Sequence, residues 1–208
     1  AGLIMRELKG FAVFDGDKSE TLSEKAISIS DDELNSFLSR FKLGFETIRR
    51  VDNPSIRAVT THKVYDASGK VTGEISMSLS DTESNGTNKL FDMAPIFVKA
   101  LSSRRVLVID EFGSSMHPMI TRMLISLFNS KETNPMGSQL IFTTHDTNLL
   151  DNKFLRRDQI WFTEKDETAS TDLYSLVEFK NASGVKVRND RSYEKDYING
   201  RYGAIPYL

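Results

Sequence analysis

The feature that most constrains this chain is a run of four apolar residues at 106–109, which reads Val-Leu-Val-Ile. A run this dense, between two arginines and two acids, predicts a fully buried central strand. A second run of this kind, 139–144, follows a segment with helical spacing of apolar residues at 117–129. Strand, helix and strand in this order predict an α/β fold with a mostly parallel sheet flanked by helices.

Two later segments are predicted to continue this sheet. Residues 159–163 and 171–176 have strand-like patterns, and Trp161 is expected to lie in the core. A small antiparallel hairpin is predicted over 58–80, because two stretches rich in β-branched residues flank a polar turn.

Two more segments have the spacing of helices. Residues 31–41 begin with three acids, which favour a helix amino-terminus, and continue with Leu34, Phe37 and Leu38 at helical spacing. Residues 88–101 carry a similar apolar stripe. The tail from residue 183 onward shows no clear period.

Composition limits the protein class. The chain has 208 residues, 39% of them hydrophobic and 27% charged, with a formal net charge of -2. Such a chain can bury a core, and its balance of charge does not indicate nucleic acid or membrane as a partner. Cysteines are absent, no apolar run reaches the roughly 20 residues that span a bilayer, and no signal-peptide pattern occurs at the start. We therefore expect a cytoplasmic protein.

Two acids directly follow the first predicted strand. Asp110 and Glu111 stand at its carboxyl end, where open α/β sheets bind their ligands. One carboxylate can hold a metal through water while the other polarises an attacking water, which suits chemistry on a phosphate. The alternative is that Asp110 only caps the following helix. The acids alone leave both interpretations open.

Two other segments carry polar groups that suit a phosphate site. His145 follows the second predicted strand, so it is expected near the same sheet end, where it can donate a hydrogen bond to a terminal phosphate oxygen. Ser84 and Gly86 lie in a polar loop that leads into a helix, and such a loop can bind an anion through its amides and hydroxyl. Many loops of this kind are only turns or caps.

Together these segments resemble the carboxyl-terminal half of ABC-type ATPases, including SMC-like and abortive-infection-type bacterial ATPases. The resemblance covers residues 58–208. It rests on motifs that match in order: the loop at 79–87 to the signature region, 106–111 to Walker B, 114–117 to the D-loop, His145 to the switch histidine, and the segments 156–162 and 200–206 to the abortive-infection subgroup.

The resemblance implies a role for each matched residue. Asp110 would support Mg²⁺ through water, Glu111 would act as the catalytic base, and His145 would contact the γ-phosphate of ATP. The remaining residues would lie at a nucleotide-bridged homodimer interface. They are Ser84 and Gly86, which would serve the partner's nucleotide, and Ser114 and His117 in the D-loop. His117 replaces the usual Asp, and it equally suits the start of a helix before Pro118.

A phosphate-binding Walker A loop, Gly-x-x-x-x-Gly-Lys-Ser/Thr, does not occur in this sequence. Residues 16–19 come near but insert an Asp between Gly and Lys, and Gly69-Lys70 lacks the following hydroxyl. We therefore expect that residues 1–57 are the end of a helical insertion and its re-entry, and that 58–208 are the carboxyl-terminal lobe. The amino-terminal lobe would then be an absent partner, and the chain alone would be inactive.

Two other function classes are weighed against an ATPase. A degenerate head that docks a protein or DNA would explain the missing loop, and the tail mixes basic residues with tyrosines as nucleic-acid sites do. Acids dilute that charge, so a solvated or docking surface is favoured over nucleic acid. A metal-dependent nuclease using Asp110, Glu111 and Asp146 ranks lower, because these acids are too few for a two-metal cage.

Overall fold

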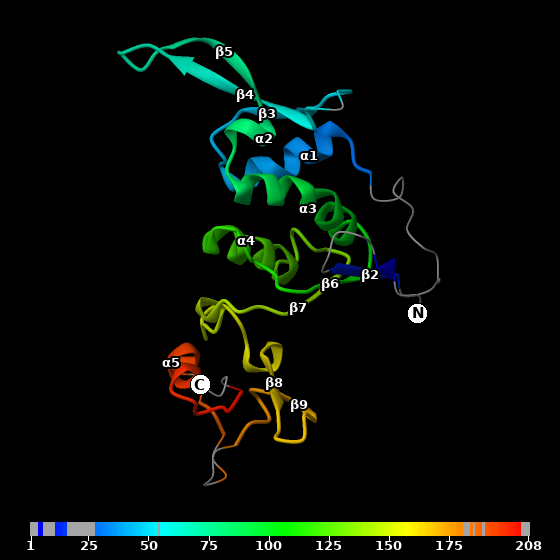
Figure 1. Ribbon diagram of the computed structural model, residues 1–208, viewed down its shortest axis with the longest axis vertical. Helices are drawn as coiled ribbons and strands as arrows, with labels where there is room; N and C mark the ends of the chain where they lie inside the picture. Colours follow the sequence, from blue (N-terminus) through cyan, green and yellow to red (C-terminus); the bar gives the residue numbers. More distant parts are fainter. Residues whose placement is uncertain are drawn as a thin grey trace. The chain divides into compact units, whose positions relative to one another are not determined.

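The computed structural model describes residues 4–5, 11–15, 28–53, 55–180, 184, 186–188 and 190–204, with backbone only for the first two segments. The chain forms two compact units, Ala1–Thr144 and His145–Leu208 (Figure 1). The near-match to Walker A at residues 16–19 lies outside the described residues. None of the described helices is long and apolar enough to cross a membrane.

The first unit contains a four-stranded sheet in the order β1 (Ile4–Met5), β2 (Phe11–Asp15), β6 (Arg105–Ile109) and β7 (Gln139–Phe142). The pair β6–β7 is parallel, whereas β1–β2 and β2–β6 are antiparallel. The prediction of an α/β fold is confirmed, but the prediction of a mostly parallel sheet is wrong for this sheet. The spacing of apolar residues identifies a strand, but it does not show which strand lies beside it. Here β2, which lies near the start of the sequence, pairs antiparallel with β6.

The burial of the two predicted central strands is only partial. Leu107 and Ile109 of β6 are buried, but Ile141 of β7 is 56% exposed. Among the described strands β7 has a neighbour on one side only, so one of its edges and part of one face remain open.

Helices α3 (Asn85–Leu101) and α4 (Pro118–Asn129) contact the sheet at β6 and β7, respectively. Their apolar stripes form the core of the unit, as the helical spacing predicts. Phe97 of α3 lies at its centre, with its ring 6.0 Å from that of Phe112 and 5.8 Å from that of Phe128. This aromatic contact connects the carboxyl-terminal part of α3 to the chain that follows β6.

A second sheet in this unit is antiparallel, in the order β3 (Thr47–Arg50), β4 (Ala58–Tyr65) and β5 (Val71–Ser78). The predicted hairpin is therefore confirmed. So is the predicted amino-terminal helix, which consists of α1 (Asp31–Leu38) and the short turn η2 (Ser39–Phe41).

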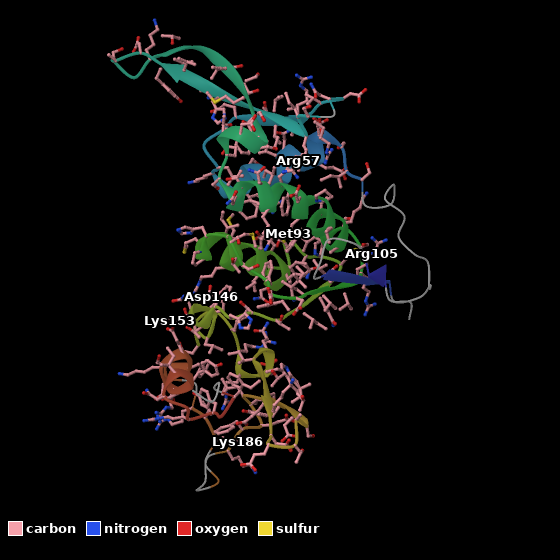
Figure 2. All side chains as sticks on the ribbon, in the orientation of Figure 1. Arg57, Met93, Arg105, Asp146, Lys153 and Lys186 are labelled. Atoms are coloured by element: carbon pink, nitrogen blue, oxygen red, sulfur yellow. The ribbon has the colours of Figure 1, made fainter. Side chains whose placement is uncertain are left out.

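Two polar contacts fix helices against this second sheet. The Asn35 side chain of α1 accepts from the backbone N–H of Ile48 at 2.7 Å and donates to its carbonyl at 2.8 Å. Arg57, which lies beside α3 in Figure 2, donates to the Asp92 carboxylate at 2.6 Å and to Asn88 at 3.0 Å. A short helix, α2 (Leu79–Thr82), joins β5 to the loop before α3.

The second unit holds β8 (Trp161–Lys165) and β9 (Thr171–Ser175), which form a separate two-stranded antiparallel sheet. They do not extend the parallel pair, so the prediction of a third and a fourth strand in one sheet is wrong. Trp161 is 54% exposed rather than core, and its indole N–H donates to the Asp158 carbonyl at 3.2 Å. Its neighbour Phe162 points inward instead, because side chains alternate along a strand.

The core of the second unit is aromatic. The ring of Phe162 stacks on those of Tyr197 and Tyr202 at 5.5 and 5.6 Å. Short turns η3 (Thr147–Leu149) and η4 (Arg157–Gln159) and the helix α5 (Tyr193–Ile198) complete the unit.

Basic residues of the second unit pair with acids of the same unit. Arg191 donates twice to the buried Asp196 carboxylate, at 2.5 and 2.9 Å, and Arg201 lies 3.2 Å from it. Two exposed pairs are Arg156–Asp158 and Arg188–Asp190. These contacts reduce the free positive charge of the tail, so they favour a solvated surface, and a nucleic-acid partner stays a prediction.

Alkaline pH is expected to destabilise the second unit through its buried phenols. Burial and the nearby Glu164 raise the pKa of Tyr174 to about 12, and burial with Asp196 raises the pKa of Tyr202. Above about pH 10 the unfolded chain loses these phenol protons while the folded chain keeps them. The contribution of these phenols to the free energy of unfolding is therefore fully present below that pH and is lost as the pH rises.

The substitution Tyr174→Phe tests this expectation, because it removes one of the phenols whose pKa the fold raises. Urea unfolding followed between about pH 9 and pH 12 should give a slope of stability against pH that is shallower by about one proton than the slope of the unchanged chain. An unchanged slope would contradict the assignment.

Candidate functional site

The two acids after β6 lie in a tight turn that β7 holds in place. Thr143 directly follows β7, and its hydroxyl donates to the Asp110 carboxylate. The same hydroxyl oxygen of Thr143 accepts from the backbone N–H of Glu111 at 2.8 Å. A backbone hydrogen bond also joins this turn to the residue after β7, because the Phe112 N–H donates to the Thr143 carbonyl at 2.8 Å. The parallel pairing of β6 and β7 therefore brings both strand ends together, as expected for a ligand site.

The backbone of this acid turn, residues 110–113, has an uncommon conformation. Glu111 has φ of 52°, and Gly113 has φ of 89°. A residue with a side chain pays an energy of about 1–2 kcal/mol in the left-handed region. At Gly113 a Cβ would also lie 3.0 Å from the Thr121 side chain, so glycine is required there. Strain at a residue of this kind often marks a functional position.

The amino-terminal part of α3 meets the segment after the acid turn. A Cβ on Gly86 would lie 3.4 Å from the Ser115 carbonyl, so the two backbones approach closely. The Lys89 ammonium donates to the carbonyl and the hydroxyl of Ser114, at 2.7 and 2.9 Å. The structure thus brings Gly86 and Ser114, which are both predicted site residues, to one place.

Two predicted site residues are helix caps. The Ser84 hydroxyl accepts from the Thr87 N–H at 3.1 Å and caps α3. His117 Nδ1 accepts from the Met119 N–H at 3.2 Å and caps α4. The cap of α4 is therefore His117 and not Asp110, so the alternative that Asp110 serves as that cap is wrong.

The predicted switch histidine belongs to the second unit. His145 is the first residue of that unit and directly follows Thr144, whose hydroxyl donates to the Phe112 carbonyl at 3.0 Å. Its neighbour Asp146 caps η3, accepting from the Asn148 N–H at 3.0 Å. A phosphate contact by His145 stays a prediction.

A protein-family model described as "AAA domain, putative AbiEii toxin, Type IV TA system" matches residues 10–151, more than half of the chain. This chain belongs to that AAA-domain family. No curated protein is similar enough to count as a relative. The match covers all of the predicted site residues and leaves β8, β9 and α5 outside it.

The acid turn of this AAA domain fits Mg²⁺ that is bound together with a nucleotide. Among the described residues, no group of three or more His, Asp and Glu side chains would hold a metal by itself. Mg²⁺ in phosphate-processing sites is commonly held by one or two carboxylates, substrate phosphates and water. Asp110 and Glu111 are exposed oxygen donors of this type.

Sequence reasoning missed two residues of the site. Thr143 orients Asp110, and Lys89 joins the amino-terminal part of α3 to Ser114. A hydroxyl directly after the second strand was the available signal for Thr143, since parallel neighbours end at the same sheet edge. No pattern signalled Lys89, because its contact spans 25 residues and depends on how α3 packs.

Removing the Thr143 hydroxyl is expected to loosen the acid turn. Thr143→Val keeps the shape and strand preference but leaves the Asp110 carboxylate and the Glu111 N–H without this partner. We expect the free energy of unfolding to fall by about 1–2 kcal/mol in urea titrations. Thr143→Ser, which keeps the hydroxyl, is the matched control and should lose clearly less. Equal losses in both variants would show that the hydroxyl is not the cause.

Proposed function

We propose that this chain supplies the acid-bearing part of an ATP-hydrolysing site of the ABC or SMC-like type. The observation that carries the proposal is the Asp110–Glu111 pair at the end of β6, held by Thr143 from the parallel neighbour β7. Membership in an AAA-domain family supports an ATPase-like, nucleotide-binding role.

Each residue then has a defined task. Asp110, oriented by Thr143, holds the magnesium ion that neutralises phosphate charge when ATP is bound. Glu111 accepts a proton from the attacking water or orients that water. His145 donates to the terminal phosphate. Ser84 and Gly86 face the nucleotide of a second copy, with Ser114 and His117 at the same dimer interface.

A complete site also needs a phosphate-binding loop. The 208-residue sequence contains no Gly-x-x-x-x-Gly-Lys-Ser/Thr string, so we propose that polypeptide outside this sequence contributes that loop. The chain by itself should then bind ATP weakly and hydrolyse it negligibly. The family description names a toxin of a type IV toxin–antitoxin system, and we propose that the ATPase acts in such a system or in abortive infection.

Calorimetry of magnesium-dependent ATP binding tests the proposal. It compares the chain alone with a longer chain that also carries the phosphate-binding loop. Binding by the longer chain alone would support a site built from both parts. Binding by neither would favour a module that docks a protein or DNA, and magnesium-dependent turnover by the 208-residue chain alone would contradict the need for a loop from outside.

A further inference from the structure

The hairpin of β4 and β5 extends past the helices of its unit (Figure 1). It carries exposed apolar side chains. Val64 and Ile75 are 41% and 44% exposed, and Tyr65 and Val71, on either side of the turn, are 57% and 45% exposed. A two-stranded hairpin without further cover is only marginally stable in water. Exposed apolar groups on such an element therefore indicate a surface that another chain covers.

One face of the hairpin continues the buried face of its sheet. Ala58 and Thr60 of β4 are fully buried, and side chains alternate along the strand, so Val64 lies on that same face. The register pairs Val64 with Gly73 and His62 with Ile75. Ile75 and Val64 thus extend an apolar face beyond the part that the helices cover.

The outer edge of β5 is open, and its one irregularity is a shift in register at the turn end, where Val64 pairs with Gly73 and Tyr65 with Val71. No strand among the described residues pairs with this outer edge. Exposed edges are normally blocked by lysine, proline or several charges, yet β5 contains Glu74 as its one charged residue and no lysine or proline. Such an edge is ready to accept another strand.

The contacts of β4 define which backbone groups of β5 face outward. The Thr61 carbonyl accepts from the Glu46 N–H at 2.7 Å, so the polar groups of Thr61 face away from β5. Ser76 is paired with Thr61, so the backbone N–H and carbonyl of Ser76 point to the open edge of β5. Backbone groups alternate in direction along a strand, so those of Glu74 and Ser78 also point to this edge.

We propose that β5 pairs antiparallel with β5 of a second copy of this chain, about a two-fold axis at Ile75. This register joins outward-facing Glu74 to Ser76 of the second copy and places the two Ile75 side chains directly opposite each other. Gly73 lies opposite Met77, so a position without a side chain meets a long flexible one. The pairing extends the apolar face across both hairpins.

Other symmetric registers are less favourable. An axis at Glu74 would set two carboxylates opposite each other, and like charges in that position are destabilising. An axis at Ser76 would pair a shorter part of β5. We therefore assign the open edge of β5 to the β5 strand of a second copy, because the two strands can pair about Ile75 without placing like charges opposite each other.

Light scattering on size-exclusion chromatography, without nucleotide, tests the proposal in the 208-residue chain. The unchanged chain should form dimers that dissociate on dilution. Ile75→Lys and Ile75→Glu each place like charges at the axis and should weaken the dimer about a hundredfold. A mixture of the two variants should restore it, because opposite charges then meet.

Tyr65→Lys is the matched control, since it adds the same charge to the hairpin away from the axis and should leave the dimer intact. Circular dichroism checks that each variant is folded. A chain that stays monomeric at every concentration, a dimer that survives Ile75→Lys, or a mixture that stays monomeric would overturn the proposal. None of these outcomes depends on ATP binding, so they are independent of the proposed function.

Discussion

Glu111→Gln is expected to lower magnesium-dependent ATP hydrolysis by a factor of about 10²–10⁴ in the longer chain that carries the phosphate-binding loop. Glutamine keeps the size of the side chain but cannot accept a proton from the attacking water. Binding should persist, because Asp110 and its Thr143 contact are unchanged. Single-turnover assays with radiolabelled ATP, together with calorimetry, would show bound ATP that is not cleaved.

The matched control is Glu132→Gln, an exposed acid of the same unit that lies outside the acid turn. It should leave both binding and turnover unchanged. Hydrolysis in Glu111→Gln at the rate of the unchanged protein would remove Glu111 from the catalytic role. Equal loss in both variants would indicate a general effect of charge.

A second substitution separates chemistry from folding at the same residue. Because Glu111 has φ of 52°, Glu111→Gly should relieve backbone strain and raise the free energy of unfolding by roughly 0.5–1 kcal/mol. Glu111→Ala should give no such gain, since alanine also has a Cβ. A site that becomes more stable and less active would show that the strain is retained for function.

Phe97→Ala is expected to lower the free energy of unfolding of the first unit by about 3–5 kcal/mol. Phe97 is fully buried, and its ring contacts those of Phe37, Phe112 and Phe128 at 6.3, 6.0 and 5.8 Å. Truncation removes these contacts and leaves a cavity between α3 and the chain that follows β6. Urea unfolding followed by circular dichroism would measure the loss.

Phe97→Leu is the control, because it keeps most of the volume and should cost clearly less than alanine. Phe112 directly follows Glu111, so the cavity should also loosen the acid turn and weaken magnesium-dependent ATP binding in the longer chain. A loss below about 1 kcal/mol for Phe97→Ala would show that the core collapses around the gap and that Phe97 does not support the turn.

Local patterns determined most elements of this protein. The helix at α1 follows from three acids before a helical apolar stripe, and Ser30 caps it as such sequences favour. The hairpin follows from β-branched stretches around a polar turn, and β6 from its four apolar residues. The placement of Asp110 and Glu111 at a strand end also follows from the sequence, since it depends on residues that adjoin in the chain.

Partners distant in the chain were decided only by the tertiary structure. The antiparallel contact of β2 with β6, the separate sheet of β8 and β9, and the exposure of Trp161 depend on which edges and faces meet. The same holds for Thr143 on Asp110 and for Lys89 on Ser114, which are separated by 33 and 25 residues. A sequence shows the period of each element, whereas packing of the whole chain selects the neighbour that each one contacts.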